Sequence, residues 1–261
     1  MYYVLTGREA LPQYFPKDAV GAEVGVAQGD YSAVVLQAAQ PRELHLIDPW
    51  SHLESGSDPL SATELLDQVE QARALGEEFA APPVNSEGDK EYARIVARFE
   101  GDRRVCLHRQ YSYKAAASFE DGFFDFVYLD GNHHYEFVLK DLQDFAAKLK
   151  PGGLLFGHDF FEDAFAREEH YGVAEAVNTF LKRSDFRFFM LTSEQFSTFC
   201  LARRLDGFAG EFLRNVLEST IEMIELPDGF ASSYRDKNYQ RRDGSLKRIP
   251  SFVSPSQFLH A

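Results

Sequence analysis

The sequence is poor in cysteine and contains no long apolar run. Its 261 residues include two cysteines, Cys106 and Cys200, in no spacing that would suit a metal cluster or a disulfide framework. There is no stretch of 18 apolar residues, and the first residues lack the basic start and apolar centre of a secretory signal. We therefore expect two reduced, buried thiols in a cytoplasmic protein that does not span a membrane.

Positive charge is also scarce. The chain has 27 Lys and Arg against 41 Asp and Glu, which gives a formal net charge of −14. Binding to nucleic acid or to an anionic membrane surface requires clustered cations, so we expect neither partner. The hydrophobic fraction of 44% is typical of a globular protein.

Charge divides the chain into regions. Residues 51–100 hold 11 acidic and four basic side chains, and this acidic insertion is too polar to form core. The stretch after Ser233 is locally basic, so net charge alone excludes anionic substrates only weakly. We expect an N-terminal lid segment at 1–18, a core at 19–204 that contains the insertion, and a C-terminal extension at 205–261. The C-terminal extension begins with a helix-like stretch over 208–224, and we expect the extension to serve as a lid or an oligomer contact.

Short apolar runs alternate with amphipathic segments through the core, which predicts a parallel sheet covered by helices. A gap of three residues separates the last two runs, and it is too short for a parallel crossover. We therefore predict an antiparallel hairpin that closes the end of the sheet. The expected strands are 20–26, 43–50, 104–110, 124–130, 153–160, 186–192 and 196–203.

The first strand runs into a glycine turn that opens a helix. Gly25 and Gly29 are four residues apart, unlike the tighter glycines of a dinucleotide fingerprint. Glu23 and Asp30 would place two carboxylates beside the position of a pyrophosphate, which disfavours phosphate and favours a cationic ligand. S-adenosylmethionine carries an ammonium and a sulfonium in that half of the molecule. Asp48, at the end of the second strand, is placed to accept the hydroxyls of an adenosine ribose, although this spacing also suits NAD.

Two carboxylates, Asp130 and Asp159, end neighbouring predicted strands, and His133 follows the first. Two converging carboxylates, with His133 and Asn132 nearby, suit Mg²⁺ or Mn²⁺ through oxygen ligands, and His133 could accept a proton near neutral pH. Alternatively, Asp159 caps the helix that follows it.

The ordered motifs E-V-G-x-x-x-G-x-x-S, I-D-P-W, Y-L-D-G-x-H-x-Y and L-K-P-G-G-L-L-x-G-H-D resemble class I S-adenosylmethionine-dependent methyltransferases over residues 19–204. The resemblance is closest to the small-molecule O-methyltransferase branch, which includes macrolide sugar enzymes and, more distantly, catechol-type enzymes. It implies a Rossmann-like α/β fold with a doubly wound, seven-stranded sheet whose last strand is antiparallel. The cofactor residues it implies are Glu23, Gly25, Gly29, Ser32, Asp48, Trp50, Ser112 and Asp130.

The resemblance also assigns roles at the strand ends. Asp130 and His133 are implied to be catalytic, with His133 as the base, and Asp130, His158 and Asp159 are implied metal ligands. His158 departs from the relatives, which have a carboxylate there. This weakens a Mg²⁺ site and favours Mn²⁺, Fe²⁺, Zn²⁺ or no metal.

We therefore predict methyl transfer from S-adenosylmethionine to a hydroxyl of a small molecule. Two alternatives remain. Gly131, Asn132 and His133 imitate an element of metallophosphoesterases, and the fold could also serve a non-catalytic subunit that binds the adenosine cofactor. A homodimer is expected if the aromatic C-terminal region packs against a second copy.

Overall fold

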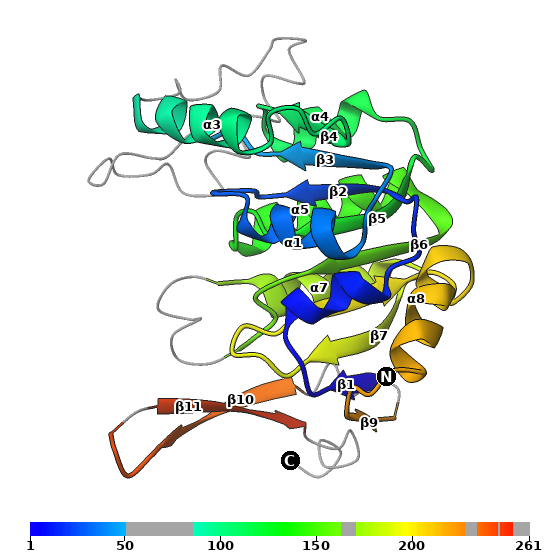
Figure 1. Ribbon diagram of the computed structural model, residues 1–261. Helices are drawn as coiled ribbons and strands as arrows, with labels where there is room; N and C mark the ends of the chain where they lie inside the picture. The colour runs from blue at the N-terminus through cyan, green and yellow to red at the C-terminus, as the bar shows by residue number, and fades with distance from the viewer. Residues whose placement is uncertain (51–85, 163–170, 228–233, 245, 253–261) are drawn as a thin grey trace.

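The computed structural model describes residues 1–50, 86–162, 171–227, 234–244 and 246–252. Its centre is a nine-stranded mixed sheet with the strand order β4-β3-β2-β5-β6-β8-β7-β1-β9, seen from top to bottom in Figure 1. The strands are β1 (Tyr2–Val4), β2 (Val20–Val24), β3 (Glu43–Ile47), β4 (Val105–His108), β5 (Phe124–Leu129), β6 (Leu149–Gly157), β7 (Arg187–Thr192), β8 (Phe199–Ala202) and β9 (Met223–Glu225).

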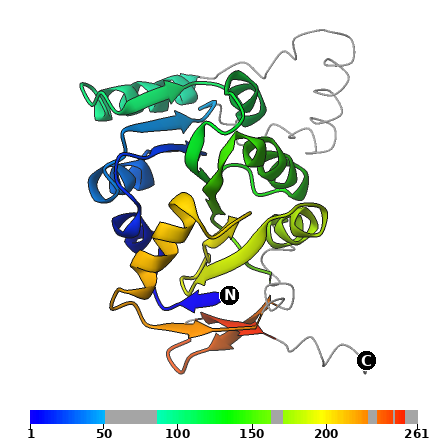
Figure 2. The same cartoon turned by 90° about the vertical axis from the view of Figure 1, so that its right-hand side faces the viewer.

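Helices cover both faces of this sheet, as Figure 2 shows. One face packs against α4 (Ser112–Ser118), α5 (Tyr135–Lys148) and α7 (Val173–Arg183). The other packs against the 3₁₀ helix η1 (Arg8–Tyr14), α1 (Asp30–Ala38), α3 (Ser86–Arg98) and α8 (Gly207–Leu217). Because both faces are covered, the central strands carry mostly apolar side chains, and all five residues of β2, including Glu23, are buried.

The predicted fold class, a Rossmann-like α/β sheet with an antiparallel strand near its end, is confirmed. The predicted number of seven strands is wrong, and the hairpin does not close the sheet. β8 inserts between β6 and β7, and β1 then pairs in parallel with β7 and antiparallel with β9. The sheet therefore extends into both segments that flank residues 19–204.

The predicted helix over 208–224 is too long. α8 ends at Leu217, and Ser219 stops it by donating its hydroxyl to the Val216 carbonyl and accepting the Ile221 N–H. Met223–Glu225 then forms β9, because β1 offers an unpaired edge. In the basic tail, β10 (Tyr234–Gln240) and β11 (Leu246–Phe252) form a separate antiparallel ribbon.

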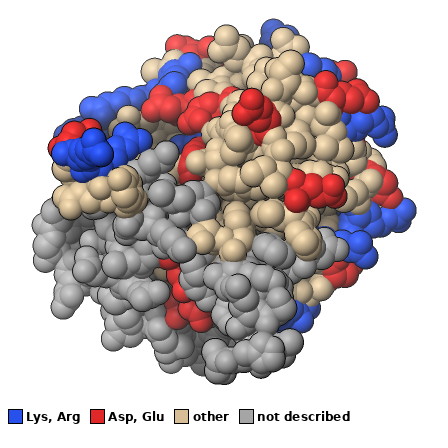
Figure 3. Space-filling model, turned by 90° about the horizontal axis from the view of Figure 1, so that it is seen from below, with Lys and Arg blue, Asp and Glu red and all other residues tan. Residues whose placement is uncertain are grey.

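The acidic insertion lies mostly outside the described residues, and its last part forms α3. On the described part of the face in Figure 3, acidic, basic and uncharged side chains are interspersed. Both cysteines carry free thiols. None of the helices in the described ranges combines the length and the apolar character needed to cross a membrane.

Candidate functional site

The carboxyl ends of the parallel strands lie at the left in Figure 1, and the glycine turn stands where the strand order reverses, between β2 and β5. Ligands of open α/β sheets bind at such switch points. Gly25 has φ +87°, and a Cβ there would overlap the carbonyl oxygen of Asp130. The two loops therefore meet only because residue 25 has no side chain.

Three polar atoms beside the glycine turn are buried without a hydrogen bond of good geometry among the described residues: Glu23 Oε2, Tyr31 Oη and Ser32 Oγ. Burial, reinforced by the nearby charge of Asp130, raises the pKa of Glu23 to about 8, although the Ser32 hydroxyl opposes the rise. Unpaired buried polar groups are costly, so this cluster is typical of a place where a polar ligand completes the bonding.

The predicted electrostatic exclusion of phosphate is weaker in the structure. Glu23 is mostly protonated at pH 7 because its pKa is about 8. Asp30 is exposed and forms an ion pair with Arg98, at 2.7 Å between Oδ1 and Nη1. Arg98 also donates to the Gln28 carbonyl at 2.6 Å, so α3 fastens the glycine turn from outside.

Asp48 lies at the end of β3 and binds the same turn. Its Oδ2 accepts the N–H groups of Val26 and Ala27 at 2.9 and 3.0 Å, and its Oδ1 accepts that of Trp50 at 2.6 Å. Trp50 is 1% exposed, donates its indole N–H to the Ala27 carbonyl and packs on Tyr92 of α3. Asp48 thus fixes the backbone of the glycine turn, and the buried Trp50 side chain binds the same turn from the core side.

His133 and Asp159 come together as a pair. His133 Nδ1 lies 3.1 Å from Asp159 Oδ2, and its ring stacks on Tyr171 with a centroid distance of 4.6 Å. Asp159 is buried and has φ +59°, which turns the chain sharply after β6. A carboxylate beside Nδ1 favours the proton on that nitrogen and leaves Nε2 as a proton acceptor.

His158 is surrounded by carboxylates and does not join Asp130 and Asp159 as a metal ligand. Its Nδ1 is 3.4 Å from Asp159 Oδ2 and 3.8 Å from Asp130 Oδ1, and its Nε2 is 3.9 Å from Glu194 Oε2. Burial by itself would lower the pKa of His158, but these three carboxylates outweigh burial and raise the pKa to about 9. The imidazole is therefore mostly protonated at neutral pH, and a metal ion would have to displace that proton in order to bind it.

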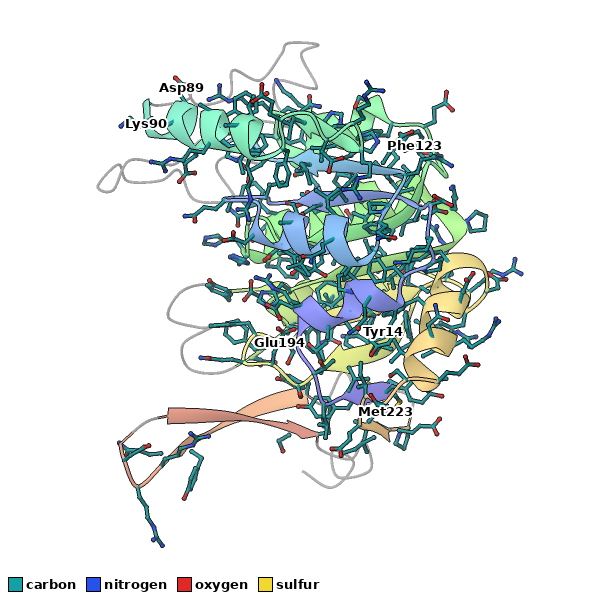
Figure 4. All side chains as sticks on the ribbon, in the orientation of Figure 1. Tyr14, Asp89, Lys90, Phe123, Glu194 and Met223 are labelled. Atoms are coloured by element: carbon teal, nitrogen blue, oxygen red, sulfur yellow. The ribbon has the colours of Figure 1, made fainter. Side chains whose placement is uncertain are left out.

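Sequence reasoning missed Arg8, which η1 carries into the site. Its Nη1 donates to Asp130 Oδ2 at 2.6 Å and to the Tyr128 hydroxyl at 2.7 Å. Its backbone N–H donates to Glu194 Oε1 at 3.0 Å, and Glu194 lies beside η1 in Figure 4. Arg8 and Glu194 stand in no recognisable motif, and only the pairing of β1 with β7 brings η1 to the strand ends.

Asp141 was missed too, although the sequence carries a signal for it. It follows Val138 by three residues, so its carboxylate lies on the buried, otherwise apolar side of α5. Burial raises its pKa to about 7, opposed by a hydrogen bond from Ser112, which begins α4. A pocket opens here, lined by Leu129, Asp130, Gly131, Asn132, His133, Val138, Asp141, His158, Val173 and Phe199.

The residues at the glycine turn fit the predicted cofactor. At Gly25 the backbone is open to close approach because there is no side chain. Two buried oxygens beside it, Glu23 Oε2 and Ser32 Oγ, have no hydrogen-bond partner of good geometry among the described residues. These are groups that would hold the ammonium and carboxylate of an amino acid moiety.

The predicted metal ligands fit a dication poorly. One donor atom each of Asp130, His133 and Asp159 lies within 4.8 Å of the others, so His133 replaces the predicted His158 in the only such group among the described residues. Yet Arg8 already binds Asp130, and His158 is cationic beside both carboxylates.

Comparison with known proteins gives one assignment of family. Residues 22–160 match the family model described as a methyltransferase domain. No curated protein matches the chain significantly.

Solved structures are similar at low identity. They include a Corynebacterium glutamicum protein, with 11% identity, 76% of this chain and 79% of that chain covered, and a TM-score of 0.49. A SAM-dependent methyltransferase from Aquifex aeolicus has 14% identity, with 76% of this chain and 90% of that chain covered, and a TM-score of 0.47. The spermidine synthase from Thermotoga maritima has 15% identity, with 79% of this chain and 60% of that chain covered, and a TM-score of 0.46. Because these TM-scores are all below 0.5, we base the family assignment on the family match alone.

Proposed function

Because the chain belongs to the class I S-adenosylmethionine-dependent methyltransferases, we propose that it transfers the methyl group to a hydroxyl of a small molecule, with His133 as the base. The observation that carries this proposal is the pair of His133 and Asp159, 3.1 Å apart, beside the pocket at the end of β5. The family match leaves no support for the metallophosphoesterase alternative.

The chemistry divides between cofactor and chain. When bound, S-adenosylmethionine supplies an electrophilic methyl group, whose bond to sulfur breaks with its electron pair left on sulfur. His133 Nε2 takes the proton of the acceptor hydroxyl as its oxygen forms the new bond to carbon. Asp159 stabilises the imidazolium that results, and the rigid strand ends align the acceptor with the methyl group.

The pocket indicates a small acceptor. His133, Asn132 and Asp130 offer polar contacts, and Val138, Val173 and Phe199 offer apolar ones. This mixture suits an acceptor with a hydroxyl on a partly apolar skeleton, such as a sugar-bearing natural product. We place the reaction in the cytoplasm, as the composition indicates.

A test compares two neighbouring histidines. His133→Ala should bind S-adenosylmethionine as the parent does in calorimetry but lose about 10²–10⁴-fold in S-adenosylhomocysteine formation over a panel of hydroxyl acceptors. His134→Ala is the matched control and should turn over normally. Equal turnover of the His133 variant and the parent would remove the base from the mechanism. Tight cofactor binding with no transfer to any acceptor would favour the non-catalytic subunit.

A further inference from the structure

Arg8 is a cation fixed at both ends. Its backbone N–H is bound by Glu194, and its guanidinium is bound by Asp130 and Tyr128 and lies over the Tyr31 ring, 5.2 Å from the ring centre. The Arg8 side chain is 24% exposed, so the contacts with Asp130 are only partly screened by water. Such a guanidinium holds its place without a bound ligand.

The carboxylates that would hold a metal are therefore already paired. Asp130 Oδ2 lies 2.6 Å from Arg8 Nη1, and Asp159 Oδ2 lies within 3.4 Å of both His133 and His158. A dication bound to the other oxygen of Asp130 would lie close to the guanidinium, and the two positive charges would repel. Tyr128 holds the guanidinium in place from a second side, because its hydroxyl accepts from the same Nη1.

We propose that Arg8 takes the place of a divalent cation at Asp130, so that this chain transfers methyl groups without a metal ion. The proposal rests on the proposed function for its chemistry. Asp130 lines the pocket, and Arg8 binds it at 2.6 Å. The guanidinium therefore supplies a fixed positive charge at the wall of the pocket, where a Lewis acid would otherwise act.

The proposal makes an unusual prediction about metal binding. One donor atom each of Asp130, His133 and Asp159 already lies close enough to the others to bind an ion, and Arg8 is the group bound directly to Asp130 that opposes one, with His158 as a second, more distant neighbour. Replacing Arg8 by an uncharged side chain should create a site for a divalent ion. Adding Asp130→Asn should remove it again, because one ligand is lost.

The experiment measures Mn²⁺ alone, by electron paramagnetic resonance of free Mn²⁺ titrated with chelator-treated protein. The parent and the control Arg104→Met, whose arginine pairs with Asp102 away from the site, should show only weak, unsaturable binding. Arg8→Met should gain one site at least tenfold tighter, and Arg8→Met/Asp130→Asn should lose it. Arg8→Gln serves if circular dichroism shows that Arg8→Met is unfolded.

Two results would overturn the proposal: one saturable Mn²⁺ site in the parent, or no gain in a folded Arg8 variant. Because no cofactor or acceptor is present, the outcome is independent of methyl transfer. Absence of S-adenosylmethionine binding in calorimetry would defeat the proposed function and leave the Mn²⁺ result standing.

Discussion

Gly25→Ala tests how closely the two loops of the site approach. A Cβ at residue 25 would overlap the carbonyl group of Asp130 and lie 2.5 Å from the Gly131 Cα, all of them backbone atoms that cannot rotate away. A φ of +87° adds a cost of about 1–2 kcal/mol for alanine, and the overlap adds about 1–3 kcal/mol. The free energy of unfolding should therefore fall by about 2–5 kcal/mol.

A second glycine separates these two contributions. Gly122 also has a positive φ, +72°, but a Cβ there would meet nothing within 4 Å. Gly122→Ala should therefore lose only the backbone cost of about 1–2 kcal/mol. In thermal unfolding of a chain this size, each kcal/mol corresponds to about 2–4 °C, so the difference between the variants is measurable.

Cofactor binding provides the second measurement. Gly25→Ala should weaken S-adenosylmethionine binding at least tenfold in calorimetry, because the end of β2 must move away from Asp130, whereas Gly122→Ala should bind as the parent does. Equal losses of stability in the two variants would refute the close approach. Unchanged binding in Gly25→Ala would refute the location of the cofactor at this turn.

Two further predictions concern pH. The pKa of Glu23 is raised to about 8, so its contribution to stability is present below its unfolded value and is lost as pH rises toward 8. Between pH 5 and 8, the free energy of unfolding from denaturant titrations should fall more steeply with pH for the parent than for Glu23→Gln, by up to about 1.4 kcal/mol per pH unit. If the two proteins lose stability in parallel, Glu23 is not a buried ionisable group. His45 and His108 contact each other at 2.9 Å, and burial lowers the pKa of both, so stability should fall as pH drops below about 6.5. His45→Phe should flatten that acid limb, which stability curves at pH 4.5–7 would measure, and an unchanged limb would exclude the pair as its cause.

Local patterns were sufficient for the alternating strands and helices. The apolar runs at 20–26 and 124–130 end within two residues of β2 and β5, because a strand covered on both faces carries mostly apolar side chains, with Glu23 and Asp125 as the acidic exceptions here. The same patterns placed Asp130, His133 and Asp159 at strand ends, and parallel pairing then brought them together. The family match also agrees with the order of the motifs.

Other features depend on contacts that no local pattern encodes. The three residues Tyr2–Val4 become a strand only because β7 and β9 offer edges, and Met223–Glu225 leaves the expected helix for the same reason. Likewise, α3 binds the glycine turn through Arg98, which donates to Asp30, 68 positions away in the sequence.

The sequence by itself determined the α/β class and the set of residues at the strand ends, because both follow from periodicity and from spacing along the chain. Only the tertiary structure decided how those residues are charged and paired. Arg8 meets Asp130 across 122 positions, and His158 becomes cationic because three carboxylates surround it in a partly buried site. Charge state is a property of the surroundings, and the surroundings exist only once the chain has folded.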